Sequence, residues 1–331
     1  MRSGLFTTFI LALILPLVVS AQTFGGLGDS AAFSISADPQ YPEPYSQITL
    51  SVVSSTLDLN NATLTVTVAK KEIYQGNVRP VAVPVGKTGS VTSVVVKINS
   101  AGANYSQTLS IQPQDVALIA EPISSAPVFY PGKSLVPLEG DVRVVAMANL
   151  QNANGNIADP STFSYSWTVD DTQIASASGI GKRAIIVASP LQYRARKVSV
   201  AVMSQDGSLV GGASLSFTAE NPSVRIYKSD PLLGILSDHA LSGGYTITGA
   251  ESTLYAAPFS LPTTSGFPLL QWFLNGEVAQ TGNSITLRPS GSGEGNASIS
   301  LVASSGDSTR ATEDLSLSFG AATGGFGFFG L

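Results

Sequence analysis

The chain of 331 residues contains no cysteine and only one histidine, His239. Thiolates and imidazoles are the usual protein ligands of zinc, and the thiolate is a common catalytic nucleophile. Their scarcity excludes Cys/His zinc sites, cysteine hydrolases and disulfide scaffolds. Basic residues are also few, with 17 Lys and Arg against 22 Asp and Glu, and they form no long run. The electrostatic footprint of nucleic-acid binding is therefore absent.

Apolar residues, by contrast, are abundant and make up 44% of the sequence. This is enough apolar surface to offset the entropy lost on ordering, which excludes disorder along the whole chain. The length predicts two or three domains of roughly 100 to 150 residues each. Without disulfides, each domain must be stabilised by burial of its own core, which a domain of that size can supply.

The N-terminus has the pattern of a secretory signal peptide. Arg2 precedes the apolar run 5–19, and Val19-Ser20-Ala21 places small residues where a signal peptidase cleaves. The run has about 15 residues, fewer than the roughly 20 that span a bilayer. We therefore predict cleavage after Ala21 and an extracellular or cell-surface location for the mature protein.

A motif of about 100 residues occurs three times in the mature chain. Val66, Trp167 and Trp272 occupy equivalent places in a middle strand that runs into a turn, and they are separated by 101 and 105 residues. A final strand of alternating serine and apolar residues repeats with nearly the same period. Its three copies are Leu109-Ser110-Ile111, Leu215-Ser216-Phe217 and Leu317-Ser318-Phe319.

Within each copy the apolar residues recur at every second position, as in Leu64, Val66 and Val68. This period is typical of a strand with one buried face, and the frequent Gly, Asn, Asp and Pro residues mark turns. Asn275-Gly276 is predicted to form a tight hairpin turn. The sequence therefore predicts an all-β chain of three tandem β-sandwiches. The expected segments are a signal peptide at 1–21, an N-terminal tail at 22–28, domains at 29–113, 114–221 and 222–320, and a Gly/Phe-rich C-terminal tail at 321–331.

Two segments resemble a known type of module. Trp167–Asp171 and Trp272–Gly276 resemble the third strand of immunoglobulin-like and PKD-like modules in exported, multi-domain bacterial surface proteins. The resemblance covers nearly the whole mature chain and implies an immunoglobulin-like sandwich in each copy. The stretch Arg225–Gly234 also resembles exported bacterial proteins, some of them suspected of serving surface or pilus assemblies.

The side chains that carry chemistry do not form a catalytic or metal-binding motif. We interpret His239 as a solvated loop residue, because no nucleophile elbow accompanies it. Asp170 and Asp171 are adjacent, so along a strand they would point to opposite faces, and a turn is the favoured interpretation. A calcium site that adds Asp206 to this pair lacks the usual calcium-loop sequence. We predict a non-catalytic protein with no cofactor or metal.

The basic cluster Arg194–Lys197 has two interpretations. It precedes an alternating strand, which favours a solvated turn or a charged strand edge. The alternative is a grip on an anionic wall polymer. Prolines around 122–137 and 222–231 are expected to stiffen the connections between domains, since proline fixes φ.

Aromatic residues provide two further candidate sites. Trp167 and Trp272, with Val66 in the first copy, are predicted to be core residues, and stacking on sugars is the alternative for the tryptophans. The C-terminal tail contains three phenylalanines and a leucine, and it has no charged residue. A solvated tail gains nothing from such side chains, so we hypothesise contact with a partner, a neighbouring domain or a membrane interface. These residues are Phe326, Phe328, Phe329 and Leu331.

These observations predict an exported cell-surface protein that acts as a structural spacer, a scaffold or an adhesion module. Its expected partners are other surface proteins or cell-wall polymers, with peripheral membrane contact through the tail and no nucleic acid. The alternative is a sandwich that binds carbohydrate or another ligand, which needs exposed aromatic residues gathered on one face.

Overall fold

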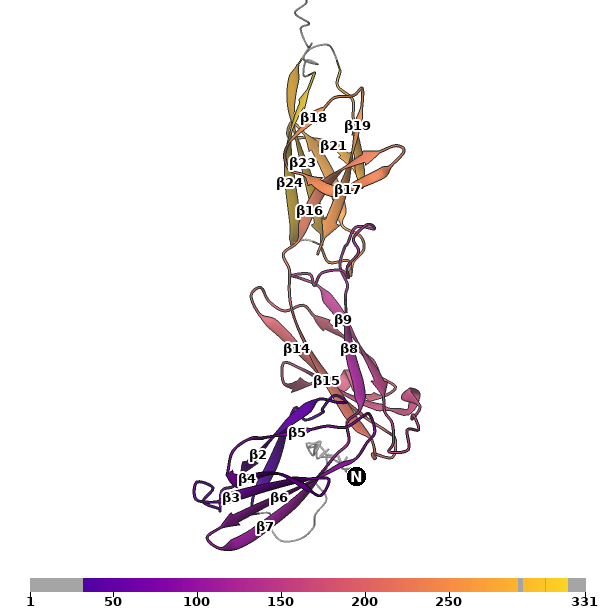
Figure 1. Cartoon of the computed structure of the whole chain (residues 1–331). Helices are drawn as coiled ribbons and strands as arrows, with labels where there is room; N and C mark the ends of the chain where they lie inside the picture. Colours follow the sequence, from indigo (N-terminus) through magenta and orange to yellow (C-terminus); the bar gives the residue numbers. More distant parts are fainter. Residues whose placement is uncertain (1–31, 291–293, 307, 321–331) are drawn as a thin grey trace, which may run out of the picture. The chain divides into compact units, whose positions relative to one another are not determined.

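The chain folds as three tandem immunoglobulin-like β-sandwiches, which confirms the predicted fold class (Figure 1). The computed structural model describes residues 32–290, 294–306 and 308–320. These residues form strands, turns and two short 3-10 helices. The predicted signal peptide and both predicted tails lie outside the described residues.

The first sandwich pairs a three-stranded sheet, in the order β1-β2-β5, with a four-stranded sheet, in the order β4-β3-β6-β7. Its neighbouring strands run antiparallel, and their buried positions alternate with exposed ones as the sequence period requires. The strands are β1 Ser34–Asp38, β2 Gln47–Val53, β3 Thr63–Val68, β4 Lys71–Asn77, β5 Val81–Pro84, β6 Thr92–Ser100 and β7 Ala103–Ile111.

The second sandwich repeats this arrangement, with sheets ordered β13-β9-β8 and β11-β10-β14-β15. A short additional strand, β12, pairs with β10, and two 3-10 helices lie in the connections. The elements are β8 Asp115–Pro122, β9 Asp141–Asn149, η1 Pro160–Thr162, β10 Ser164–Val169, β11 Thr172–Gln173, η2 Ala175–Ala177, β12 Gly179–Ile180, β13 Ala184–Ala188, β14 Ala195–Met203 and β15 Val210–Thr218.

The third sandwich keeps the shared strand order and adds two strands, β17 and β18, between its first and second shared strands. Its sheets are ordered β17-β16-β19-β22 and β18-β24-β23-β20-β21, and β18 pairs in parallel with β24. The strands are β16 Ser223–Asp230, β17 Gly234–Leu241, β18 Gly243–Ile247, β19 Ser252–Phe259, β20 Leu269–Leu274, β21 Glu277–Thr281, β22 Ser284–Leu287, β23 Gly295–Ser305 and β24 Thr309–Phe319.

A tight two-residue turn follows the middle strand in every sandwich, directly after β3, β10 and β20. Both residues of each turn have positive φ, which matches the right-handed twist of the flanking strands. The turn at Asn275-Gly276 was predicted from the sequence. In the first sandwich the pair is Ala69 (φ 46°) and Lys70 (72°), in the second Asp170 (46°) and Asp171 (63°), and in the third Asn275 (51°) and Gly276 (87°).

The contacts divide the chain into two compact units, and the second and third sandwiches lie together in the larger one. The expectation that prolines around 122–137 belong to a connection between domains was wrong. Residues 123–140 connect β8 with β9 inside the second sandwich, and we call them the β8–β9 segment. The connection to the third sandwich is the short stretch 219–222.

Candidate functional site

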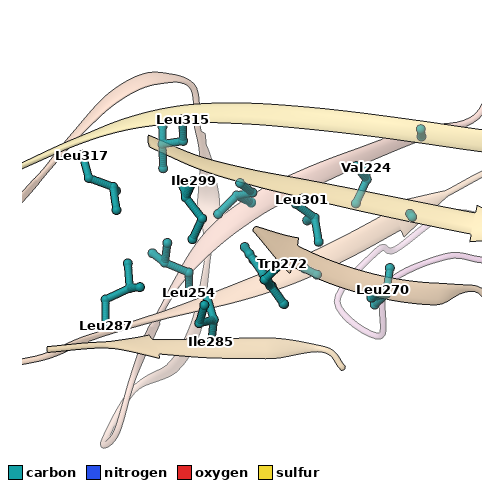
Figure 2. Close-up of a cluster of buried hydrophobic side chains, with 14 of the residues drawn as sticks. Val224, Leu254, Leu270, Trp272, Ile285, Leu287, Ile299, Leu301, Leu315 and Leu317 are labelled. Carbon is teal, nitrogen blue, oxygen red and sulfur yellow. The ribbon is translucent and has the colours of Figure 1, made fainter. Parts of the chain in front are cut away.

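The three residues predicted to form the core lie between the two sheets of their sandwiches. Val66 is 1% exposed, and Trp167 and Trp272 are both 0% exposed. Figure 2 shows Trp272 among aliphatic side chains that include Leu254 and Leu301. Both indole N–H groups donate to backbone carbonyls. The distance from Trp167 Nε1 to the Lys182 oxygen is 2.8 Å, and that from Trp272 Nε1 to the Gly282 oxygen is 2.9 Å. Neither tryptophan presents a face to a ligand.

The carboxylates considered for calcium do not meet. The backbone N–H of Asp170 donates to the carbonyl of Lys197 near the start of β14, whereas Asp206 follows the end of that strand. Strand β14 has nine residues, so the two carboxylates lie roughly 25–30 Å apart. Among the residues that the structure describes, no group of three or more His, Asp or Glu side chains is placed to hold a metal ion.

Asp206 has a local structural role in the turn between β14 and β15. Its carboxylate accepts hydrogen bonds from the hydroxyls of Ser204 (2.6 Å) and Ser208 (2.8 Å) and from the Ser208 backbone N–H (3.1 Å). These donors favour the charged form, with Ser204 contributing most, and they lower the pKa of Asp206 to about 2. The carboxylate thus organises its own turn.

His239 lies on a strand and not in the loop expected from the sequence. It is part of β17, its side chain is 88% exposed, and its Nδ1 is 3.1 Å from the Asp238 carboxylate. The imidazole is therefore exposed and paired with the carboxylate of its sequence neighbour.

The basic cluster starts strand β14, and one of its members is used structurally. Arg196 donates from a terminal guanidinium nitrogen to the carbonyl of Ala188 at 2.7 Å, and its Nε lies 3.2 Å from Asp170 Oδ2. The Nε–H direction does not meet hydrogen-bond geometry, so this second contact is an ion pair only. The other cluster residues, Arg194 and Lys197, are exposed.

The most elaborate arrangement of polar groups lies where the second sandwich meets the third. The β8–β9 segment pairs with the loop after β19 through three backbone hydrogen bonds of 2.8–3.1 Å. The Ser260 hydroxyl is fully buried and lies 3.1 Å from the carbonyl oxygens of both Val136 and Glu220, so its proton is shared between them. The N–H of Glu220 donates to the same Val136 carbonyl. Three separate chain segments are therefore joined here.

Aromatic side chains complete this joint. Phe129, at the tip of the β8–β9 segment, packs edge-on against Tyr227 with ring centroids 4.9 Å apart, and against Tyr255 at 6.4 Å. Tyr130 packs on Phe259 in the same manner at 5.6 Å. We call these five residues the aromatic clamp. Sequence reasoning missed it, because its members come from segments about 100 residues apart.

A polar hollow of about 270 Å³ borders the joint, and the carboxylates of Glu139 and Asp141 line it. Glu139 accepts a hydrogen bond from the Ser308 hydroxyl at 2.6 Å, and Asp141 accepts one from the Thr264 hydroxyl at 3.2 Å. Each carboxylate therefore already holds a side chain of the third sandwich. The two carboxylates in this hollow therefore serve to attach the second sandwich to the third.

The hypothesised contact residues Phe326, Phe328, Phe329 and Leu331 lie outside the described residues. Within the described ranges, no helix is long and apolar enough to cross a membrane.

No protein-family model and no curated protein matches the chain. Among solved structures, it resembles the three N-terminal domains of the highly immunogenic outer capsid protein of bacteriophage RB49, with 14% identity over 86% of this chain and 98% of that one, and a TM-score of 0.24. It also resembles the central fibronectin-III array of RIM-binding protein, with 10% identity, coverage of 86% and 95%, and a TM-score of 0.30.

Immunoglobulin domains 1–5 of Sidekick-1 are similar at 10% identity, covering 89% of this chain and 60% of that one, with a TM-score of 0.29. The strand order described above assigns the chain to the same broad class, the multi-domain β-sandwich proteins of immunoglobulin-like type.

Proposed function

We propose that this chain is an exported, non-catalytic cell-surface protein that acts as a structural spacer or scaffold and presents interaction surfaces on its sandwiches. The observation that carries the proposal is the joint between the second and third sandwiches. A spacer must hold a distance, and a distance is held only when neighbouring domains resist bending. Short, purely polar linkers between domains leave relative motion as the default.

The joint of this chain is built against such motion. The hydrogen bonds of Ser260 and the β8–β9 segment fix the backbone, and the aromatic clamp adds apolar burial on the outer side of β16 and β19. Each aromatic pair contributes roughly 0.5–1.5 kcal/mol beyond its buried area. Bending would break these contacts together, so we expect the second and third sandwiches to resist bending at the joint.

The side chains that fill the sandwiches support a binding or spacing role. The buried clusters of the second and third sandwiches consist of aliphatic residues, alanines and a few aromatic rings, with the tryptophan N–H groups satisfied by backbone. Interaction would then use the outer strand faces and loops, as in other sandwich domains. The expected partners are surface proteins or cell-wall polymers.

Carbohydrate binding is the alternative, and it depends on an open aromatic platform. In the described part of the chain, the aromatic side chains with ring-to-ring contacts pack edge-on against each other in the clamp, where they hold the joint. Tyr193 is 93% exposed but belongs to a different loop. A glycan array probed with the full chain separates the two functions: saturable binding to one glycan class would favour the alternative.

Protease treatment of intact cells tests the surface location. The full chain should be degraded on intact cells, and a variant lacking residues 2–21 should be retained inside and protected. A cytoplasmic protein of the same cells, which must remain uncut, controls for lysis. Protection of the full chain on intact cells would contradict the proposal.

A further inference from the structure

The outer face of the β13-β9-β8 sheet in the second sandwich carries a group of apolar residues, bordered by the ion pair of Arg143 with Glu121. Ile119, Val145 and Ala184 form one row across its three strands. Met147 and Ile186, beside this row, are 59% and 61% exposed. We call these five residues the apolar face. Contiguous exposed apolar residues of this kind commonly mark an interaction site.

The equivalent faces of the other two sandwiches show how this chain treats such a surface. In the first sandwich the face is polar, with Ser36 opposite Ser51 and Asp38 opposite Thr49. In the third it is aromatic and covered by the β8–β9 segment, so that the outward-facing Ala257 is fully buried. On the equivalent face of the second sandwich, Met147 and Ile186 are exposed and the row between them is half-buried.

The size of the apolar face limits what binds it. Three strands about 4.8 Å apart and five residues long present at most roughly 250 Å², Arg143 and Glu121 included, so two such faces packed together would bury at most roughly 500 Å². A stable protein dimer buries about 1,200–2,000 Å². The face is therefore too small for a dimer between two sandwiches, and it suits a short apolar segment.

The chain itself contains such a segment. Residues 321–331 contain three phenylalanines, one leucine and two alanines, together with four glycines and a threonine, and they have no charged side chain to desolvate. In an extended segment, Phe326 and Phe328 would fall on the same side at a spacing of about 6.8 Å. Val145 and Met147 have the same spacing along β9, because they too are two residues apart on a strand.

The segment does not reach the apolar face of its own chain. Strand β24 starts at the joint, where Thr309 lies 3.4 Å from Glu139, and it runs for 11 residues, roughly 34 Å. Strand β9 also starts at the joint, and Val145 lies a further ~14 Å along it. Ten extended residues, from Phe319 to Phe329, span at most about 36 Å, against a path of roughly 48 Å.

We propose that the Phe-rich segment 321–331 of one copy binds the apolar face of a second copy. Because the two contact surfaces differ, the copies associate head-to-tail. An assembly of any number of copies then has a free segment at one end and a free apolar face at the other, so further copies can be added. This goes beyond the spacer role, which requires no self-association. The small contact area makes each link weak in solution and stronger where many copies are held on one surface.

Sedimentation velocity of the full chain over a range of concentrations tests the proposal. The unsubstituted chain should show a mass that rises with concentration. The face variant Met147→Asp/Ile186→Asp and the segment variant Phe326→Asp/Phe328→Asp should each weaken association at least tenfold. The matched control Leu269→Asp/Val278→Asp changes side chains that are 53% and 61% exposed on the third sandwich, and it should associate like the unsubstituted chain.

An equimolar mixture of the face variant and the segment variant gives the sharpest result. The intact segment of the first should bind the intact face of the second, so dimers should form and growth should stop there. A monomeric unsubstituted chain at millimolar concentration, or undiminished self-association of either variant alone, would overturn the proposal. Far-UV circular dichroism confirms that each variant is folded.

Discussion

The indole Nε1 of Trp272 donates a hydrogen bond to the backbone carbonyl of Gly282, and Trp167 makes the equivalent bond to Lys182. Both donors are fully buried, so each bond replaces a water contact that the indole loses on folding. The same hydrogen bond occurs in two sandwiches. It indicates that a tryptophan can be buried at this position because a backbone carbonyl farther along the chain accepts a hydrogen bond from its indole N–H.

Replacing Trp272 tests this relationship. Trp272→Ala should lower the free energy of unfolding of the third sandwich by about 3–5 kcal/mol, the range for large buried aromatic residues. Trp272→Phe should cost less, because it keeps most of the apolar contact, although it leaves the Gly282 carbonyl unpaired. Calorimetry of the full chain measures both. An unchanged melting profile for Trp272→Ala would contradict core packing.

The tight turns predict a stabilising substitution. In the second and third sandwiches, the side chains of Asp170 and Asn275 accept the backbone N–H of Lys197 and Ser298, both at 2.9 Å. The first sandwich has Ala69 there, whose methyl side chain cannot accept a hydrogen bond and whose positive φ is costly.

Ala69→Asn should therefore stabilise the first sandwich by about 1 kcal/mol, through one new hydrogen bond and a lower backbone strain. Asn275→Ala should destabilise the third sandwich by a similar amount. Thermal unfolding monitored by a probe in each sandwich measures the two effects. A loss of stability in Ala69→Asn would show that the three turns are not equivalent.

The Asp206 turn predicts a pH dependence. Hydrogen bonds from Ser204 and Ser208 lower the pKa of Asp206 from 3.8 to about 2 in the folded chain. A lowered folded-state pKa gives a stabilising contribution that is complete above the unfolded-state pKa and is lost as the pH falls from about 4 through 2. Carboxyl NMR titration should show the low value, and Ser204→Ala should raise it. A pKa near 3.8 in the unsubstituted chain would refute this assignment.

Local sequence patterns predicted the fold because its determinants are local. The two-residue period gives the strands, and the repeated spacing of Val66, Trp167 and Trp272 gives the three copies. The aromatic clamp was not predictable in this way. Phe129 meets Tyr227 and Tyr255 only after the second and third sandwiches come together, and prolines on both sides made its segment resemble a linker.

The apolar face did leave a signal in the sequence. Val144–Met147 is a run of four apolar residues after Arg143, where a strand with one wet face would alternate. Such a run indicates a strand whose second face is also covered. The alternation rule locates the strand, and the run that breaks the rule marks a strand with apolar residues on both faces.

The distance between the second and third sandwiches tests the stiff spacer most directly. The chain has no cysteine, so spin labels placed through Gln173→Cys and Glu277→Cys are the only labels present. Pulsed electron paramagnetic resonance of the otherwise unsubstituted chain should give one narrow distance distribution. Adding Phe129→Ala and Tyr130→Ala should broaden it. A broad distribution before the clamp is removed would contradict the account.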